Sequence, residues 1–290
     1  MPFREAADNI INSYRFQLKI GGSRLPRLLY ASAYWGSYLW ARYIHPGRGT
    51  DPLSAHGAAM EFLGLYGLSN RLVRAILPDG TDFHIDLMTS FMILKELYED
   101  DMYEIGPGGR FEISPRQIIF DVGAQQGVFT GLAARRADGG KVVSMEPEPW
   151  NFKLLKGNIS RNNFSNVVTL PVAISDNIGR ANLYCSRLMS GGHSLLLPAA
   201  EGNSVEVPVS TLDAVSHELR IGPDLLKIDV EGSTYEVLKG AAALLSRYKP
   251  NIVMEVEIPE QREGIKAMLL PLGYQIDTRG WILFARSPSR

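Results

Sequence analysis

Short apolar runs alternate with helix-like segments along the C-terminal two thirds of the chain. From about Gln117 onward, the runs Ile118–Phe120 and Val142–Met145 are each followed by apolar residues at helical spacing, over 127–137 and 150–162. Such a run is typical of a strand that is buried on both faces of a parallel sheet. Repeated strand–helix units require a mostly parallel sheet with helices on both faces. The pattern therefore predicts an α/β domain.

The remaining segments complete this arrangement. Further strands are predicted at 167–172, 181–185, 205–209, 225–230 and 252–256, and further helices after 209, over 233–248 and from about 259. Residues 274–276 and 281–284 are predicted to close the chain as an antiparallel hairpin around the turn 278–280. Ligands of such sheets bind at the carboxyl ends of the strands, near the point where the strand order reverses.

The N-terminal third has a different pattern. Residues 1–70 carry apolar groups at helical spacing, with a break at Gly21-Gly22. Residues 71–77 and 83–87 flank a Pro-Asp-Gly turn and predict a hairpin, and a helix is expected over 89–103. The expected parts of the chain are a helical extension over 1–70, a leading hairpin and helix over 71–116, and the main domain over 117–290.

Composition and charge narrow the class of protein. The 290 residues are 45% apolar and 21% charged, with a net charge of −1, so nothing global indicates a nucleic-acid partner. The one cysteine, Cys185, excludes an internal disulfide and fits a cytoplasmic protein. The polar N-terminus predicts no secretory signal, and the apolar stretch 25–44 is interrupted by Pro, Gly and Arg, so no transmembrane segment is expected.

A glycine-bearing loop follows the first buried strand. The sequence IIFDVGAQQGVFT (118–130) ends a strand at Asp121, passes through Gly123 and Gly127 and enters a helix. Glycines let the backbone approach a ligand closely, and a helix N-terminus offers N–H groups to an anion. The spacing D-x-G-x-x-x-G puts Gln125 where a dinucleotide site needs its second glycine, which disfavours NAD and favours S-adenosylmethionine (SAM). The other interpretation is a turn whose glycines serve packing alone.

Charged residues at two further strand ends strengthen the ligand-site interpretation. Glu146 ends the next strand, where a carboxylate can accept hydrogen bonds from both ribose hydroxyls of an adenosine; a solvated carboxylate is the alternative. In LLKIDVEG (225–232), Lys227, Asp229 and Glu231 alternate with apolar residues and are predicted to share one face of a strand. Asp229 and Glu231 could face an active site, or Lys227 and Asp229 could form an ion pair at the sheet rim.

These blocks resemble a known family. The chain is similar to the FkbM family of SAM-dependent methyltransferases in IIFDVGAQQGVFT, SMEPEPWNFKLLKGN, PVAISD, VPVSTLDA and LLKIDVEGSTYEVLKGA, over about 117–257. The resemblance implies a class I, Rossmann-like α/β sheet, mostly parallel with a C-terminal antiparallel hairpin, and SAM as methyl donor. It also implies methylation of a hydroxyl on a sugar, a glycolipid or a polyketide-type natural product.

The resemblance assigns roles to individual residues. It places the SAM-binding loop at Asp121, Gly123, Ala124 and Gly127, the ribose-binding acid at Glu146, the adenine-lining segment at Ala173–Asp176 with Ala173 and Asp176 as contacts, and the strand-ending aspartate at Asp229. One departure is Thr234, which stands where the family often has the last glutamate of D-V-E-G-x-E. Any task of that glutamate is absent or moved in this chain.

Methyl transfer to an alcohol requires positioning and a base that takes the hydroxyl proton. The candidate catalytic residues are Asp229, Glu231 and His193, which lies in a glycine-flanked loop and has a suitable pKa range, although a solvated loop histidine is the alternative. Asp229 and Glu231, with Glu255 and Glu257, could instead hold a divalent cation. Only the number of carboxylates indicates a metal, so none is expected.

Aromatic residues recur in the N-terminal segment. Tyr30, Tyr34 and Tyr38 lie four residues apart, and residues 1–50 hold seven Lys/Arg against two Asp/Glu. Such a stripe within 24–45 could contact a membrane surface, form a homo-oligomer or pack inside the protein. The expected partners are a small-molecule or glycan substrate and no nucleic acid, and the expected location is cytoplasmic, with possible contact at the inner membrane face.

The sequence therefore predicts a SAM-dependent O-methyltransferase. The alternative from another class is a catalytically inactive methyltransferase fold that serves binding or assembly, since fold does not imply function. Intact Asp121, Gly123, Gly127 and Glu146 argue against that alternative. Gln125 and the absence of G-x-G disfavour an NAD-dependent oxidoreductase.

Overall fold

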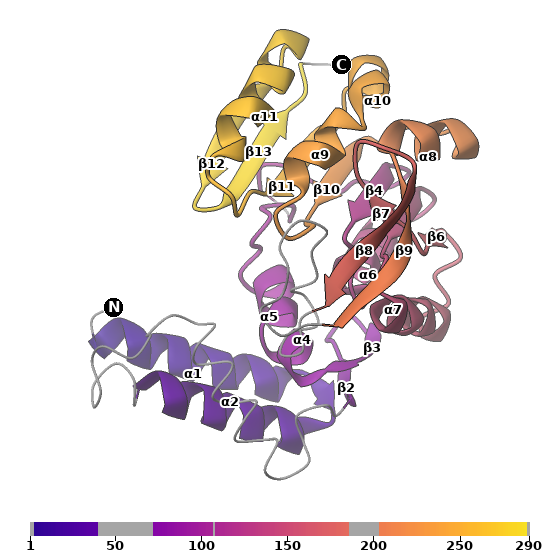
Figure 1. Cartoon of the computed structure of the whole chain (residues 1–290). Helices are drawn as coiled ribbons and strands as arrows, with labels where there is room; N and C mark the ends of the chain where they lie inside the picture. The colour runs from indigo at the N-terminus through magenta and orange to yellow at the C-terminus, as the bar shows by residue number, and fades with distance from the viewer. Residues whose placement is uncertain (1–2, 40–71, 107, 186–202, 289–290) are drawn as a thin grey trace. The chain divides into compact units, whose positions relative to one another are not determined.

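The computed structural model of the chain describes residues 3–39, 72–106, 108–185 and 203–288. The chain divides into two units, 1–102 and 103–290, and each is described by itself. Figure 1 labels the helices and strands named below.

Two longer helices and a three-stranded antiparallel sheet, ordered β1-β2-β3, form the first unit. Its elements are α1 (Phe3–Lys19), β1 (Gly21–Gly22), α2 (Arg24–Leu39), β2 (Leu72–Ile76), β3 (Asp82–Asp86), α4 (Leu87–Phe91) and α5 (Ile93–Tyr98). The predicted hairpin is confirmed, with Val73 opposite Ile85. The helix predicted over 89–103 is instead two short helices. The first begins earlier than predicted, at Leu87, because the Asp86 carboxylate accepts the Thr89 N–H at 2.8 Å and caps the first turn.

The aromatic stripe of α2 belongs to the core of this unit. Tyr30, Tyr34 and Tyr38 are buried and pack with Val73, Leu87 and Phe91. The rings of Tyr30 and Phe91 meet edge to face with centroids 5.1 Å apart. Of the three alternatives for this stripe, packing inside the protein holds for these three rings, and an interface formed by them is excluded by their burial. Among the side chains of the two helices whose burial the structure describes, the exposed large apolar ones are Ile11, Leu18, Leu25 and Leu29.

None of the helices in the described part of the chain is both long enough and apolar enough to span a membrane. Membrane or oligomer contact through 24–45 stays a prediction, and it would have to use side chains other than the buried tyrosines.

A buried arginine connects the elements of the first unit. Arg27 has 0% exposed surface. Its guanidinium donates to the carbonyl oxygens of Ile20, Gly21 and Arg74 at 2.9, 3.0 and 2.9 Å and to the side-chain oxygen of Gln17 at 3.1 Å. Burial, together with the nearby charge of Arg24, lowers the pKa of Arg27 to about 10. One side chain therefore donates hydrogen bonds to the carbonyl oxygens where the chain passes from α1 into β1, and it links this segment to β2.

Replacing this arginine should destabilise the first unit strongly. Arg27→Met leaves several buried acceptors without a donor, and each costs about 1–3 kcal/mol, so we expect a loss of about 3 kcal/mol or more in urea unfolding followed by circular dichroism. Arg24→Met, on the exposed side of the same helix, is the matched control and should change the free energy of unfolding by about 0.5 kcal/mol or less. Equal effects of the two substitutions would contradict the role of Arg27.

Seven strands form the central sheet of the second unit, in the order β12-β13-β11-β10-β4-β5-β6. They are β4 (Ile118–Val122), β5 (Lys141–Met145), β6 (Val167–Leu170), β10 (Leu225–Ile228), β11 (Asn251–Glu255), β12 (Gln275–Arg279) and β13 (Ile282–Arg286). The strands from β11 to β6 run parallel, and β12 and β13 form an antiparallel hairpin on the β11 side. The mostly parallel sheet with a C-terminal antiparallel hairpin is confirmed.

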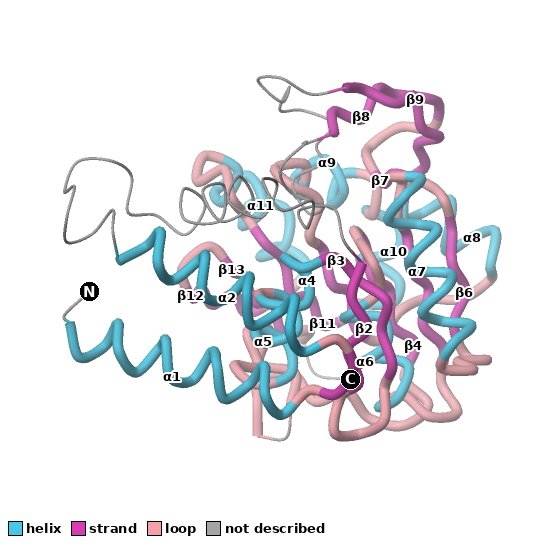
Figure 2. The backbone as a smooth tube through the Cα atoms, turned by 90° about the horizontal axis from the view of Figure 1, so that it is seen from below, coloured by secondary structure: helices cyan, strands magenta, loops and turns pink. Residues whose placement is uncertain are grey.

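Helices lie on both faces of this sheet (Figures 1 and 2). They are α6 (Val128–Arg136), α7 (Pro149–Arg161), α8 (Leu212–Leu219), α9 (Thr234–Lys239), α10 (Ala242–Tyr248) and α11 (Gln261–Leu269), followed by a 3-10 turn at Leu270–Leu272. On one face, Phe120, Ile228 and Met254 pack in a single apolar core with residues of α8 to α11. Helix α6 covers the other face, where its Thr130 hydroxyl reaches the side chain of Asp121.

A second, smaller sheet follows β6, in the order β7-β9-β8. Its strands are β7 (Ala173–Ile174), β8 (Gly179–Cys185) and β9 (Asn203–Ser210). The single strand predicted over 167–172 is wrong at its end, because Pro171 has no N–H with which to continue the ladder, and the chain moves into this second sheet.

Two predicted boundaries near the site also differ. The helix predicted over 233–248 is two helices, broken after Lys239. At Gly240 an added Cβ would lie 2.1 Å from the Ser175 carbonyl oxygen, and the Asp213 carboxylate caps α10 by accepting from the Leu244 N–H at 2.7 Å. The strand predicted over 225–230 ends at Ile228, so Glu231 is not on the same strand face as Lys227; its backbone has a φ of 50° in the following turn.

Candidate functional site

Polar side chains form a row across the middle of the sheet. Lys227 on β10 is opposite Asp121 on β4, and Asp121 is opposite Ser144 on β5. All three side chains are buried, and Thr130 on α6 joins two of them: its hydroxyl donates to Asp121 Oδ2 at 2.6 Å and lies 2.9 Å from Ser144 Oγ. This face therefore carries a hydrogen-bonded polar row just before the strands end, while the opposite face is apolar.

The glycine loop begins at the end of β4 and has left-handed backbone at three positions. The φ angles are 78° at Gly123, 50° at Gln125 and 87° at Gly127. A Cβ on Gly123 would lie 1.7 Å from the carbonyl oxygen of Asp229, so only glycine fits between β4 and the chain leaving β10. The N–H groups of Gly123 and Ala124 both donate to the Met145 carbonyl oxygen at 3.0 Å. The close contact at Gly123 and the positive φ angles show that packing and turn geometry require these glycines, and their role toward a ligand stays a prediction.

Glu146 joins the glycine loop to the tip of β5. Its side chain is buried, and its two oxygens accept the N–H groups of Gln125 and Glu148, each at 2.8 Å. Burial raises the pKa of Glu146 to about 7 against the effect of these two hydrogen bonds. A carboxylate has about four acceptor positions, so each oxygen retains capacity for one further donor, which fits the two hydroxyls of a ribose.

Lys227 occupies the centre of the site. Its ammonium donates to the Gly123 carbonyl oxygen at 2.8 Å and lies 3.3 Å from Asp229 Oδ2 and 3.4 Å from Asp121 Oδ1. Burial alone would lower its pKa, but the carboxylates of Asp229 and Asp121 outweigh this effect and hold the pKa above its usual range. The ion pair between Lys227 and Asp229 foreseen as an alternative is present; the Lys227 side chain is buried and the Asp229 side chain is half-buried.

Four carboxyl groups gather at the tips of β10 and β11. Asp229, Glu255 and Glu257 each place an oxygen within 4.8 Å of the others, a spacing that could hold a cation. Burial, followed by the charge of Asp229, raises the pKa of Glu231 to about 9 and that of Glu255 to about 8. Tyr103 donates its hydroxyl hydrogen bond to Glu255 Oε1 at 2.7 Å. The cluster therefore retains protons near neutral pH.

The other predicted site residues are placed as follows. Ala173 is buried in β7, and the exposed Asp176 forms an ion pair with Lys239 on α9. His193 lies outside the described residues. Thr234, the departure from the family pattern, is buried and donates to the Glu255 carbonyl oxygen at 2.7 Å. The ligand roles assigned from the sequence to these positions, and to Asp121, Gly123, Ala124, Gly127 and Glu146, stay predictions.

Sequence reasoning did not foresee the polar row. Lys227 was considered only as a partner of Asp229, and Ser144 and Thr130 received no role. The signal was present, because Asp121, Ser144 and Lys227 each interrupt an apolar strand near its carboxyl end. Aligning the strands by their ends would have placed the three residues side by side.

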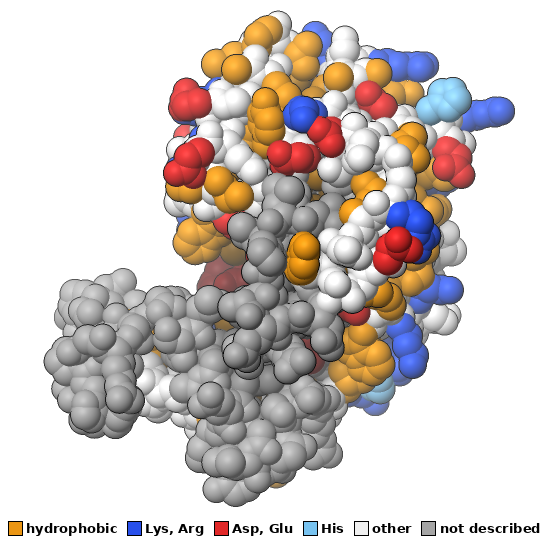
Figure 3. Space-filling view, in the orientation of Figure 1, with side chains coloured by type: hydrophobic (Ala, Val, Ile, Leu, Met, Phe, Trp, Pro, Cys, Tyr) orange, Lys and Arg blue, Asp and Glu red, His pale blue; other side chains and the backbone are white. Residues whose placement is uncertain are grey.

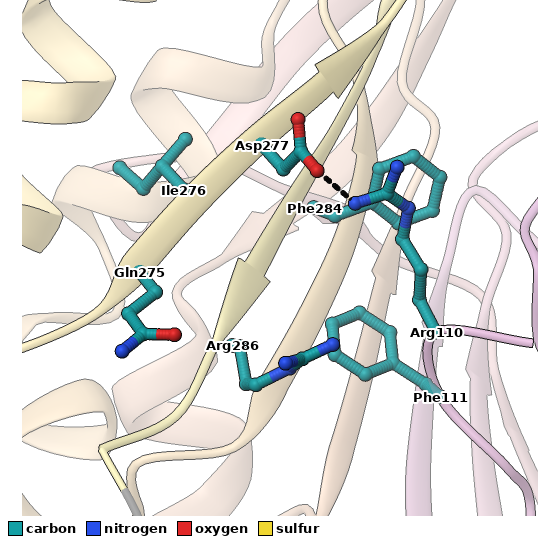
Figure 4. A pocket seen from close by; sticks show the side chains of 7 residues that line it. All are labelled: Arg110, Phe111, Gln275, Ile276, Asp277, Phe284 and Arg286. Carbon is teal, nitrogen blue, oxygen red and sulfur yellow. Dashed lines mark hydrogen bonds and ion pairs between the residues drawn. The ribbon is translucent and has the colours of Figure 1, made fainter.

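A cavity of about 230 Å³ lies at the C-terminal hairpin rather than at the strand tips. Arg110, Phe111, Asp277 and Phe284 line it, together with Gln275, Ile276 and Arg286 (Figure 4). The guanidinium of Arg110 lies over the Phe284 ring at 4.7 Å and forms ion pairs with Asp277 and Glu104. None of the predicted cofactor or catalytic residues lines this cavity, so it is separate from the candidate site.

Charged side chains of both signs are interspersed on the face drawn in Figure 3. Two of the surface ion pairs in the described part of the chain are Arg180 with Glu206 and Lys266 with Glu263.

The seven-stranded sheet, with its strand order and the glycine loop at the end of β4, defines a class I, Rossmann-like methyltransferase fold. The methyltransferase FkbM domain model matches residues 121–276, more than half of the chain. The chain therefore belongs to the FkbM methyltransferase family, whose members are SAM-dependent. The resemblance found in the sequence is confirmed.

Two relatives found by sequence agree with this assignment, and one solved structure is similar. Methyltransferase sdnD of Sordaria araneosa is 26% identical over 228 residues, 67% of this chain and 85% of that protein. The 31-O-demethyl-FK506 methyltransferase FkbM of Streptomyces tacrolimicus is 30% identical over 195 residues, 57% of this chain and 74% of that protein. A crystal structure of methyltransferase FkbM from Methylobacillus flagellatus KT is similar with a TM-score of 0.48 and 17% identity over 97% of this chain; the chain spans 60% of that protein's length.

The glycine loop allows a graded test. Gly123→Ala would place an alanine in the left-handed region, which costs about 1–2 kcal/mol, and would also press its Cβ against rigid backbone. We therefore expect the folded protein to be destabilised by about 2 kcal/mol or more. Calorimetry should also show at least tenfold weaker SAM binding. Gly127→Ala would bring its Cβ 2.6 Å from Leu155 Cδ1, the flexible end of a side chain, and should cost less. Gly157→Ala on α7 meets no atom within 4 Å and should stabilise the helix by about 0.5–1 kcal/mol. A Gly123→Ala variant no worse than Gly127→Ala would contradict the close approach.

Proposed function

We propose that the chain binds SAM at the loop 123–127 and transfers its methyl group to a hydroxyl oxygen of a sugar, a glycolipid or a polyketide-type natural product. The observation that carries the proposal is the Glu146 carboxylate, which is buried at the tip of β5, bonded to the glycine loop and still able to accept two hydrogen bonds. The O-methyl part is supported by one relative, which is named as a 31-O-demethyl-FK506 methyltransferase.

Each part of the site has a task in this proposal. SAM supplies an electrophilic methyl group on a sulfonium. The backbone of the loop 123–127 can lie close to the cofactor, and the N–H groups at the start of α6 can donate to its carboxylate. Glu146 accepts hydrogen bonds from the ribose hydroxyls. The carboxylates of Asp229 and its neighbours place negative charge at the strand tips, where a positively charged cofactor is stabilised.

The affinity for SAM should depend on the ionisation of Glu146. With a pKa of about 7, the carboxyl is mostly protonated below neutral pH and loses acceptor capacity, so wild-type affinity should rise from pH 6 to pH 8. Glu146→Gln keeps the size but not the charge. Its affinity should be weaker by roughly 1.5–3 kcal/mol for each charge-assisted bond lost, and it should lose the part of the rise that is centred near pH 7. Calorimetry with SAM measures both.

Glu148→Gln is the control for this experiment, because Glu148 caps α7 through its carboxylate oxygen and should leave the pH dependence in place. Unchanged SAM affinity in Glu146→Gln would remove the ribose assignment. Absence of SAM binding in the wild-type protein would favour the inactive binding or assembly protein.

Asp229 is the favoured base among the three candidates. Glu231, with a pKa of about 9, holds its own proton at neutral pH and is a poor acceptor for another. Asp229 forms an ion pair with Lys227 and its side chain is 29% exposed, so an acceptor hydroxyl can reach its carboxylate. His193 stays a further candidate on the sequence alone.

Turnover should separate these candidates. With a tritiated methyl donor and cell extract as the source of acceptor, Asp229→Asn should lower the transfer rate by about 10²–10⁴ while SAM still binds. Glu231→Gln should lower it less than tenfold, and His193→Ala tests the remaining candidate. Loss of SAM binding in Asp229→Asn would reassign the residue to the cofactor. We expect no effect of a chelator, because the Lys227 ammonium already lies 3.3 Å from Asp229; activity lost on chelation and restored by magnesium would favour a metal at the strand tips.

A further inference from the structure

Lys227 links two parts of the site that come from different strands. The Gly123 carbonyl oxygen, 2.8 Å from its ammonium, belongs to the loop after β4. The Asp229 carboxylate, 3.3 Å away, belongs to the chain that leaves β10. The side chain is 4% exposed and therefore interacts with protein groups rather than with solvent. Its ammonium has three hydrogens, and three acceptor groups surround it, the third being Asp121.

The surroundings fix the ammonium in place. Asp121 is itself held by the Thr130 hydroxyl at 2.6 Å, and Thr130 is on α6, the helix that begins directly after the glycine loop. The ring of Phe129 on the same helix lies 5.8 Å from the ammonium, within the range of a cation–π contact. The ammonium thus has one preferred position relative to β4, β10 and α6.

The two groups that Lys227 holds have different tasks in the proposed function. The Gly123 carbonyl sets the turn of the loop that would receive SAM, and Asp229 is the proposed base. We propose that Lys227 is a positioning residue that fixes the Gly123 turn and the Asp229 carboxylate relative to each other, and so couples cofactor binding to the group that removes the acceptor proton. This proposal rests on the proposed function.

A buried lysine of purely structural importance would be replaceable wherever the fold survives. A positioning residue needs a cation with donors at this point, so the conservative variant should recover what a neutral side chain of similar length loses. The two roles therefore differ in SAM affinity measured on folded protein, and not only in stability.

The first experiment is SAM calorimetry on three variants whose folding is verified by circular dichroism. Lys227→Met should bind SAM at least tenfold more weakly than the wild type, and Lys227→Arg should recover to within about threefold. The matched control is Lys266→Met, which removes an exposed ion pair with Glu263 on α11 and should leave the affinity unchanged. Folded Lys227→Met with affinity within twofold of the wild type would overturn the proposal. A wild-type protein that does not bind SAM would instead refute the proposed function.

A second measurement covers the case in which Lys227→Met does not fold. In wild-type protein with ¹³C at lysine Cε, saturating SAM should shift the resonance of Lys227, identified by its loss in Lys227→Arg, and leave that of Lys266 in place. The shift is expected because SAM would bind against the loop whose carbonyl the ammonium holds. A Lys227 resonance unmoved at saturation would overturn the proposal.

Discussion

Strands β4 and β10 lie side by side in the middle of the sheet, and the chain leaves both at nearly the same level. The Gly123 backbone passes so close to the Asp229 carbonyl oxygen that there is no room for a Cβ. The ammonium of Lys227 lies next to this close contact and donates to the Gly123 carbonyl oxygen. Burial raises the pKa of the Asp121 carboxyl, and the Lys227 ammonium, 3.4 Å from Asp121 Oδ1, opposes that rise. The ammonium thus lies within 3.4 Å of the Gly123 carbonyl oxygen and of one carboxylate oxygen of both Asp121 and Asp229.

The balance of charge around Lys227 explains the titration of the site. Burial raises the pKa of Glu146, Glu231, Glu255 and Glu257, and the positive charge of Lys227 opposes the rise at each. One ammonium cannot compensate so many carboxylates, so part of the group stays protonated near neutral pH. A second positive charge brought to the strand tips would favour the ionised forms, as the sulfonium of SAM would do. The site is therefore better matched to a cationic ligand than to a neutral or anionic one.

The sequence was a good guide wherever the pattern of one segment decided its structure. Apolar runs such as Ile118–Phe120 and Val142–Met145 marked buried parallel strands, and the terminal hairpin was evident from its turn. The predictions failed where a contact between distant segments decided the outcome. The break at Gly240 depends on the Ser175 carbonyl and the Asp213 cap, which are 65 and 27 residues away in sequence. The polar row has the same origin, because strand register, which no single segment reveals, brings its members together.

Thr234 illustrates how the carboxylates gathered at the tips of β10 and β11 constrain the sequence. A glutamate, which the resemblance to the FkbM family implies for this position, would start α9 beside the tips of β10 and β11, where Asp229, Glu255 and Glu257 already lie. A further buried carboxylate would raise the cost of ionising the group, since like charges disfavour one another. Threonine avoids that cost, and its hydroxyl still ties the start of α9 to β11 through the Glu255 carbonyl oxygen at 2.7 Å. The chain thus keeps the backbone connection that holds the acidic residues in place and leaves their charge to be balanced by Lys227.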